Sequence, residues 1–313
     1  MTTTEPVQRI LANFESDNPG VKANLCRMLM HGRLGGTGRM LILPVDQGFE
    51  HGPARSFQPN PPAYDPQYHF RLAVDAGLNA LAAPLGFLEA GADSFAGQIP
   101  MILKANSANA LVPKSSPKNQ AVTASVADAL RIGASAVGFS VYPGSSLALD
   151  MFEEITEMRR EAAAHGLATV IWSYPRGEAL EKRHEAAFDV VANAVQFAAL
   201  LGAHVIKVKL PAGEIGLAES ETAYKTVVPN GLSGPESLAA RVAHCMQAAL
   251  DSRRIVVFSG GSKQDDEDIY RQIRAIRDGG GNGSIIGRNT FQRSRHDALE
   301  MLDRIIRIYN DEA

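Results

Sequence analysis

From residue 40 onward, short apolar runs alternate with longer stretches in which apolar residues recur every three or four positions. The short runs are typical of buried strands, and the longer stretches have the period of helices that cover a sheet. Eight strands are predicted, over residues 40–46, 80–85, 101–106, 136–142, 169–174, 204–210, 254–259 and 284–287. Helices are predicted over residues 67–76, 87–92, 122–132, 145–165, 184–201, 234–251, 264–278 and 291–309.

Strands and helices in such regular alternation predict an α/β protein with the (β/α)8 TIM-barrel fold. A doubly wound open sheet has similar elements, but no glycine-rich dinucleotide fingerprint follows the first strand. Residues 7–31 have helical spacing, broken at Asn18-Pro19-Gly20, and predict a helical extension that covers one end of the barrel. We therefore expect one domain over residues 1–313, with the helical lead-in over 1–38 and the barrel over 39–313.

The sixth predicted strand carries two lysines where a buried strand should be apolar. Side chains alternate along a strand, so Val205, Lys207 and Lys209 share one face. If that face lines the barrel, burial and a nearby cation such as Lys104 leave part of the amine neutral, as a nucleophile toward a carbonyl requires. The alternative is a structural ion pair between a lysine and an inward carboxylate such as Asp46.

An iminium formed on such a lysine would need partners that move protons. Tyr174, at the end of the fifth strand, and Asp46, at the end of the first, are the candidates. Trp172 shares a face with Tyr174 and should line the same cavity, although packing alone also explains both aromatic residues. His51 is interpreted as an ordinary polar loop residue.

The ends of the last two strands predict a phosphate site. Ser259, Gly260 and Gly261 follow the seventh strand, and Gly287 and Arg288 follow the eighth. Glycines let backbone N–H groups approach an anion, the guanidinium adds charge, and these loops are the usual phosphate seat of TIM barrels. A phosphorylated small molecule is therefore the expected partner.

Composition narrows the function classes. The chain of 313 residues is 45% hydrophobic and 21% charged, with a net charge of −3, which indicates a globular protein without special affinity for nucleic acid or anionic lipid. Cys26 and Cys245 have no metal-like spacing, and no apolar run reaches membrane length. We expect a cytoplasmic protein without a bound metal or a cofactor.

Six segments, in order along the chain, carry a resemblance to a known family. They are Pro44-Val45-Asp46-Gln47-Gly48-Phe49-Glu50-His51-Gly52-Pro53, Ile102-Leu103-Lys104-Ala105-Asn106-Ser107, Trp172-Ser173-Tyr174-Pro175-Arg176-Gly177, Val205-Ile206-Lys207-Val208-Lys209, Phe258-Ser259-Gly260-Gly261 and Ile286-Gly287-Arg288-Asn289. As a set they resemble the archaeal-type (DhnA-like) class I fructose-bisphosphate aldolases, from the first strand to the eighth.

This resemblance implies a metal-independent Schiff-base aldolase that reversibly splits fructose 1,6-bisphosphate into dihydroxyacetone phosphate and glyceraldehyde 3-phosphate. It implies that Lys207 forms the Schiff base, that Tyr174 is the main proton-transfer residue beside Trp172, and that Asp46 is the partner of Lys207. Related aldolases form rings, so a homo-oligomer is expected. The implied phosphate ligands are Ser259, Gly260, Gly261, Gly287 and Arg288, with Lys104 and Lys209 as further substrate-binding candidates.

The chain departs from many relatives at Gln47 and Ser262, where they have histidine and proline, and either change could alter substrate preference. The second phosphate needs a basic group, for which Arg55, Arg176 and Lys263 are candidates. Two other functions stay open: the same lysine chemistry on another phosphorylated substrate, in a transaldolase-like or thiolase-like reaction, and a non-catalytic phosphosugar-binding barrel.

Overall fold

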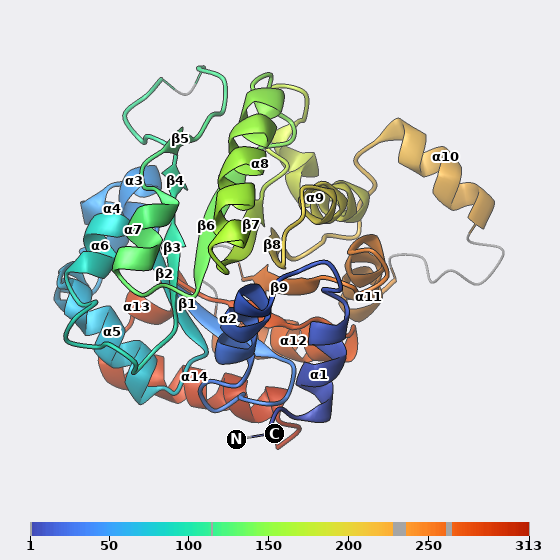
Figure 1. Ribbon diagram of the computed structural model, residues 1–313. Helices are drawn as coiled ribbons and strands as arrows, with labels where there is room; N and C mark the ends of the chain where they lie inside the picture. Colours follow the sequence, from blue (N-terminus) through green and yellow to red (C-terminus); the bar gives the residue numbers. More distant parts are fainter. Residues whose placement is uncertain (1, 114, 228–235, 261–264, 313) are drawn as a thin grey trace.

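A closed barrel of eight parallel strands forms the centre of the protein (Figure 1). The computed structural model describes residues 2–113, 115–227, 236–260 and 265–312, without the side chains of residues 47, 48 and 225–227. Around the barrel the strands follow the order β1-β10-β9-β8-β7-β6-β3-β2. They are β1 Met40–Pro44, β2 Ala80–Pro84, β3 Met101–Lys104, β6 Ala136–Val141, β7 Ala168–Ser173, β8 Val205–Lys209, β9 Ile255–Ser259 and β10 Gly283–Ile285. The predicted TIM barrel is confirmed.

Helices surround the barrel and follow the strands in sequence. The outer ones are α5 Pro66–Asp75, α6 Leu85–Glu89, α7 Val126–Arg131, α8 Ala148–Ala164, α9 Phe188–Leu200, α11 Leu238–Ala248, α12 Asp266–Asp278 and α14 Arg295–Tyr309. Further short helices lie in the loops: α3 Gln47–His51, α4 Pro53–Phe57, η1 Pro61–Tyr64, η2 Lys182–Ala186 and α13 Arg288–Phe291. A further helix, α10 Ala218–Val227, stands away from the barrel at the right of Figure 1.

Three predicted helices differ from the observed ones. The helix predicted over 122–132 begins only at Val126, because Ser125 caps it reciprocally with Asp128. The residues before it form the hairpin of β4 Asn106–Ser107 and β5 Ala121–Val122. The helix predicted over 291–309 is divided into α13 and α14, and that over 184–201 starts with the separate turn η2. Residues 234, 235 and 264 of two predicted helices lie outside the described residues.

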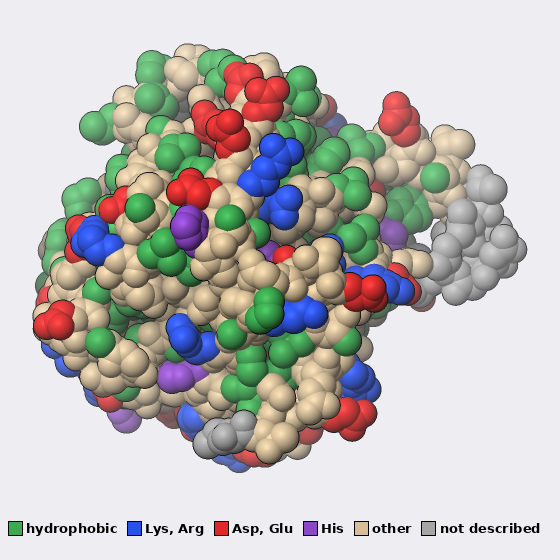
Figure 2. All heavy atoms as spheres, in the orientation of Figure 1, with side chains coloured by type: hydrophobic (Ala, Val, Ile, Leu, Met, Phe, Trp, Pro, Cys, Tyr) green, Lys and Arg blue, Asp and Glu red, His purple; other side chains and the backbone are tan. Residues whose placement is uncertain are grey.

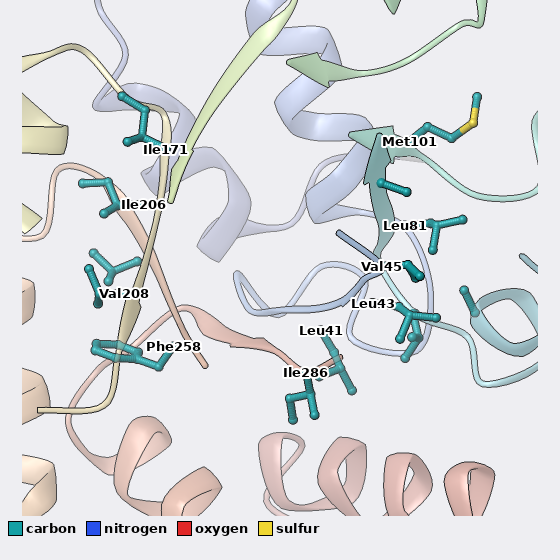
Figure 3. Close-up of a cluster of buried hydrophobic side chains, with 14 of the residues drawn as sticks. Leu41, Leu43, Val45, Leu81, Met101, Ile171, Ile206, Val208, Phe258 and Ile286 are labelled. Carbon is teal, nitrogen blue, oxygen red and sulfur yellow. The ribbon is translucent and has the colours of Figure 1, made fainter. Parts of the chain in front are cut away.

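Alternation along the strands produces two hydrophobic layers. Side chains that point outward pack against the helices, and Figure 3 shows some of them around the barrel, among them Leu41, Ile206 and Phe258. Side chains that point inward, such as Ile42, Val205 and Val257, form a separate inner core. Lysines at inward positions therefore replace apolar residues of the inner core, as the sixth-strand pattern predicts.

The N-terminal helices α1 Glu5–Ala12 and α2 Pro19–Leu29 pack on this inner core at the amino ends of the strands. Leu25, Met28 and Leu29 are fully buried there. The side-chain amide of Asn79 ties α2 to the barrel, because it donates to the carbonyl oxygens of Met28 and His31. One end of the barrel is thus closed, which leaves the carboxyl ends of the strands as the open face.

The molecular surface shown in Figure 2 carries acidic and basic side chains interspersed with hydrophobic ones. This mixture agrees with the small net charge of −3. In the part of the chain that the structure describes, no helix combines the length and the apolar character needed to span a membrane.

Candidate active site

Lys207 lies in β8, and its side chain enters a cavity at the carboxyl end of the barrel. The residue is only 6% exposed. Its amine donates a hydrogen bond to the Tyr174 hydroxyl and lies 4.0 Å from the centre of the Tyr174 ring. Burial lowers the pKa of Lys207 from 10.5 to about 7, while the Asp46 carboxylate acts in the opposite direction. About half of this amine is therefore neutral at pH 7, the form that attacks a carbonyl.

Trp172 and Tyr174 form the wall of the cavity beside Lys207. Trp172 is paired in register with Lys207 on the neighbouring strand β7 and is almost fully buried. Gly138 on β6 makes room for it, since a Cβ atom there would overlap the indole ring. Burial raises the pKa of the Tyr174 phenol well above 10.0, so this hydroxyl stays protonated at neutral pH and can donate a proton.

The segment after β1 adds two carboxylates and an imidazole to the cavity. Asp46, Glu50 and His51 all line it. Asp46 and Glu50 raise the pKa of Lys207 through their charges, and Asp46 makes the larger contribution of the two. The His51 imidazole is half-buried, and burial lowers its pKa.

Arg176 lies across the aromatic wall. Its guanidinium carbon is 4.6 Å from the centre of the Tyr174 ring and 5.8 Å from that of Tyr142, distances typical of cation–π contacts. One guanidinium nitrogen is 3.9 Å from a Glu50 oxygen, and another is 3.8 Å from a Glu185 oxygen. Arg176 is thus held between two carboxylates, directly above the proposed proton donor.

The two other predicted lysines have different environments. Lys209 lines the cavity nearer its mouth, and its amine lies 2.8 Å from a Glu185 oxygen. Lys104 is fully buried inside the barrel, 5.8 Å from the centre of the Trp172 ring, and its amine donates to the Asn106 carbonyl. Lys104 is not among the cavity-lining residues, so a direct phosphate contact is not supported for it.

The glycine-rich side of the cavity lies on β9 and β10. Ser259, Gly260, Gly287, Arg288 and Asn289 all line the same cavity as Lys207. A Cβ atom added at Gly260 would make ordinary van der Waals contacts, at 3.6 Å with Gln272 and 3.8 Å with Asn289. The predicted phosphate seat and the predicted nucleophile therefore belong to one site.

Some predicted residues lie outside the described part of the chain. Gly261, Ser262 and Lys263 follow β9 and are not among the residues that the structure describes, and neither is the side chain of Gln47. The two described candidates for the second phosphate, Arg176 and Arg55, lie in different cavities. Arg176 lines the Lys207 cavity, whereas Arg55 lines a neighbouring one.

Two functional residues escaped the sequence analysis. Glu185 lies in η2 and is the common partner of Lys209 and Arg176, while Tyr142 follows β6 and carries part of the Arg176 contact. Neither stands in a motif. Glu185 reaches the site through a loop whose course no local pattern predicts, whereas Tyr142 is the last residue of the strand predicted over 136–142, and that position at a strand end was the available signal.

Groups of several chemical types line this cavity together. A buried amine with a lowered pKa, a phenol and two carboxyl groups lie with the glycine-rich ends of β9 and β10, and carbonyl attack through an iminium uses groups of these types. Among the described residues, no group of three or more histidine, cysteine, aspartate or glutamate side chains is arranged to hold a metal ion.

Comparison with known proteins agrees with this chemistry. Residues 40–293 match the family model described as DeoC/LacD family aldolase. The chain is 34% identical to the probable fructose-bisphosphate aldolase class 1 of Chlamydia muridarum, across 97% of this chain and 88% of that protein. It is 36% identical to the fructose-bisphosphate aldolase class 1 of Thermoproteus tenax, across 84% and 86% of the two chains.

A solved structure is similar over almost its whole length. It is an archaeal fructose-1,6-bisphosphate aldolase whose catalytic lysine is covalently bound to the carbinolamine intermediate of the substrate. The sequence identity is 31%, the TM-score is 0.74, and the match covers 91% of this chain and 98% of that one.

Proposed function

The chain belongs to the DeoC/LacD aldolase family, and we propose that it is a class I fructose-bisphosphate aldolase, a lyase that uses a Schiff base. It cleaves fructose 1,6-bisphosphate reversibly into dihydroxyacetone phosphate and glyceraldehyde 3-phosphate, a step of glycolysis and gluconeogenesis. The observation that carries the proposal is the buried Lys207 amine, hydrogen-bonded to Tyr174 in a cavity with a glycine-rich anion side.

In the first step the neutral Lys207 amine attacks the C2 carbonyl of the substrate to form a carbinolamine. Tyr174 is the proton donor, because its hydroxyl oxygen accepts a hydrogen bond from the Lys207 amine and burial raises its pKa, so the hydroxyl is protonated before this step. Donation of its proton to the carbinolamine oxygen releases water and leaves the iminium. Asp46 stabilises the positive charge that develops on the nitrogen.

In the second step the iminium accepts the electrons of the C3–C4 bond. The proton of the C4 hydroxyl goes to the Tyr174 phenolate left by the first step, and glyceraldehyde 3-phosphate departs. Tyr174, which now carries the proton of the C4 hydroxyl, protonates the enamine at C3 and restores the iminium. Water then adds to the iminium while the Tyr174 phenolate takes a proton from it, and the carbinolamine divides into dihydroxyacetone phosphate and the neutral Lys207 amine. Trp172 forms the cavity wall beside Lys207, which keeps bulk water away from the enamine.

The two phosphates bind at opposite sides of Lys207. We assign the phosphate near C1 to the loops at Gly260 and Gly287, which line the cavity together with Ser259 and Arg288. Of the described candidates for the other phosphate, Arg176 is favoured, because it lines the same cavity as Lys207. Lys209 contributes positive charge at the mouth of the cavity.

Trapping tests this function. Borohydride reduction in the presence of dihydroxyacetone phosphate should leave a covalent adduct on Lys207, identified by peptide mass analysis. The Lys207→Ala variant should form no adduct and lose cleavage activity by at least 10³-fold. The matched control is Lys182→Ala, an exposed lysine of η2, which should react like the wild type. Full activity of Lys207→Ala would overturn the proposal.

A substrate panel separates this reaction from other uses of the same lysine. Negligible cleavage of fructose 1,6-bisphosphate, with adduct formation on another phosphorylated ketone, would instead support a transaldolase-like or thiolase-like reaction. Binding of sugar phosphates that raises the melting temperature without adduct or turnover would support a non-catalytic phosphosugar-binding barrel.

We also propose that the enzyme works in the cytoplasm as a homo-oligomer, and that the lead-in over residues 1–38 belongs to one domain with the barrel. The free thiols of Cys26 and Cys245 suit a reducing compartment. The burial of α2 against the inner core supports a single domain, and α10, which stands away from the barrel, offers surface for assembly (Figure 1). Light scattering combined with size-exclusion chromatography tests the oligomer.

A further inference from the structure

His204, the residue that precedes β8, joins the strand of Lys207 to the N-terminal lead-in. It is buried, at 2% exposure. Its backbone N–H donates to the Thr169 carbonyl oxygen at 3.0 Å, and its Nδ1 atom accepts a hydrogen bond from the Thr169 N–H at 2.9 Å. His204 is therefore bonded to the adjacent chain through both its backbone and its ring, three residues before the point at which Lys207 pairs with Trp172.

The other ring nitrogen of His204 reaches the lead-in. Because Nδ1 accepts a hydrogen bond, Nε2 carries the ring proton and donates a hydrogen bond to the Asp17 carboxylate, 3.1 Å away. Asp17 lies between α1 and α2, and its side chain is only 17% exposed. This hydrogen bond holds the pKa of Asp17 below its usual range, and the charges of Arg254 and Arg159 act in the same direction. The carboxylate is thus ionised at neutral pH.

A second contact of the same type lies at β2. Asn79 precedes this strand, and its Oδ1 atom accepts a hydrogen bond from the Leu41 N–H at 2.8 Å, while its own N–H donates to the Leu41 carbonyl at 2.9 Å. The amide nitrogen of the same side chain donates to the carbonyl oxygens of Met28 and His31 in the lead-in. The lead-in is therefore held at two strands of the barrel, by side chains that also complete the pairing of those strands.

The lead-in fills the barrel beneath Lys207. Several inward side chains of β2, β6 and β7 are small, namely Ala80, Ala82, Ala136 and Ala168. Large apolar side chains of the lead-in pack into the same cluster, among them Phe14, Leu25, Met28 and Leu29. The cluster also contains Trp172, the wall of the Lys207 cavity. A barrel with so small a lining would have room for water below the lysine if the lead-in moved away.

The charged groups that act on Lys207 lie mainly at the opposite, open end of the barrel. They are Asp46, Glu50, Arg176 and Lys209. The Tyr174 hydroxyl accepts its hydrogen bond at the same end, and Lys104 lies inside the barrel on β3. Burial, the largest cause of the lowered pKa of Lys207, depends in addition on the packing beneath it.

We infer that the lead-in is a plug that excludes water from the barrel beneath Lys207, and that Asp17 and His204 are positioning residues that hold this plug in place. The inference rests on the proposed function, because it assigns both residues to the reaction of Lys207. Loss of the Asp17–His204 hydrogen bond would let water approach the amine from below, and hydration stabilises the ammonium form. The amine would then be protonated, and inactive as a nucleophile, up to a higher pH than in the wild type.

The test is the pH profile of kcat/KM for fructose 1,6-bisphosphate cleavage, with each variant normalised to its own plateau. Asp17→Ala should move the low-pH side of the profile up by about one pH unit, which lowers the normalised activity at pH 6 about tenfold. His204→Asn should do the same, because asparagine can still accept from the Thr169 N–H but is too short to reach Asp17. The double variant should show the same displacement as either single variant, since both remove one hydrogen bond.

The sign of the displacement separates the plug from a direct effect of charge. Removal of the negative charge of Asp17 alone would lower the pKa of Lys207 and move the profile to lower pH. Asp17→Asn removes the charge but keeps an oxygen that accepts from Nε2, so its profile should lie at or slightly below the wild-type position. Glu15→Ala, which removes an exposed carboxylate from the same connection between α1 and α2, is the matched control and should leave the profile unmoved.

Hydrogen exchange over residues 5–29, followed by mass spectrometry, shows whether the lead-in has loosened. A profile that stays in place or moves to lower pH in both Asp17→Ala and His204→Asn would overturn the inference, and faster exchange in those variants would then show that the contact serves stability alone. Plateau turnover shows that a variant has folded, and either variant decides the question. Wild-type turnover and the Lys207 adduct leave the proposed function standing in that case, whereas their absence would overturn the proposed function itself.

Discussion

The charge balance around Lys207 makes two substitutions act in opposite directions. Lys209 lies two residues along β8, about 6.6 Å away at roughly 3.3 Å per residue. Its positive charge lowers the pKa of Lys207, as does that of Arg176. Glu185 pairs with both cations and so reduces their effect. Removal of Lys209 should therefore raise the pKa of Lys207, and removal of the Glu185 charge should lower it.

The size of the effect follows from Coulomb's law. With the backbone spacing of about 6.6 Å taken as the separation of the two charges, they interact by about 2.5 kcal/mol at an effective dielectric constant of about 20, equivalent to nearly two pH units. The Lys209 side chain is 26% exposed and already paired with Glu185, so solvent and the carboxylate reduce this value. We expect a displacement of about one pH unit in each direction, up for Lys209→Met and down for Glu185→Gln.

The assay is the pH profile of kcat/KM for fructose 1,6-bisphosphate cleavage, with each variant normalised to its own plateau so that weaker phosphate binding cancels. At pH 6 the wild-type amine, with a pKa of about 7, is about 9% neutral. The corresponding activity at pH 6 should be about 1% of the plateau for Lys209→Met and about half for Glu185→Gln. The reasoning would be refuted if the low-pH side of the profile moved in the same direction for both variants, or did not move for either of them.

Three further results are expected. Gly138→Ala should lower stability by about 1–3 kcal/mol in urea unfolding and reduce kcat, because the added methyl group displaces the Trp172 indole; wild-type values in both assays would contradict this. Lys207→Met removes a group whose pKa is about 7 in the folded protein and 10.5 as the ordinary value of a lysine. Between these two pH values the unfolded wild type binds one proton that the folded wild type does not bind, so the stability of the wild type increases with pH. Wild-type stability relative to Lys207→Met should therefore rise by about 2–3 kcal/mol between pH 7 and pH 9, and a flat difference would show that Lys207 is not perturbed. Dialysis against a chelator should leave cleavage activity unchanged, whereas a strict requirement for added divalent metal would contradict the Schiff-base assignment.

The barrel could be predicted from the sequence because each strand is buried on both sides. Such strands appear as short apolar runs, and inward positions that are polar then stand out, as Lys207 does between Ile206 and Val208. The same alternation placed Trp172 and Tyr174 on one wall. Local patterns therefore identified the residues whose positions depend only on strand period.

Residues that reach the site through loops could not be found in this way. Glu185 approaches Lys209 from η2, and the loop after β3 returns to the barrel through the pairing of β4 with β5, which no local pattern predicted. No local pattern in the sequence marks Gly138 as important either, because the glycine is required by the volume of the Trp172 indole on the neighbouring strand. Long-range contacts of this kind have no local period.

Burial, more than any neighbouring charge, produces the reactive form of Lys207. It is the largest cause of the lowered pKa, and it acts against Asp46 and Glu50, which favour the charged amine. That burial depends on the whole barrel, because Trp172 and the inner apolar layer lie beside and beneath the lysine and α2 closes the opposite end. The two carboxylates then have a different task, since they stabilise the positive charge that appears only when the iminium forms. Burial from water disfavours the charged form of the free amine, and the nearby carboxylates stabilise the charged iminium. Together they favour conversion of the free amine into the iminium.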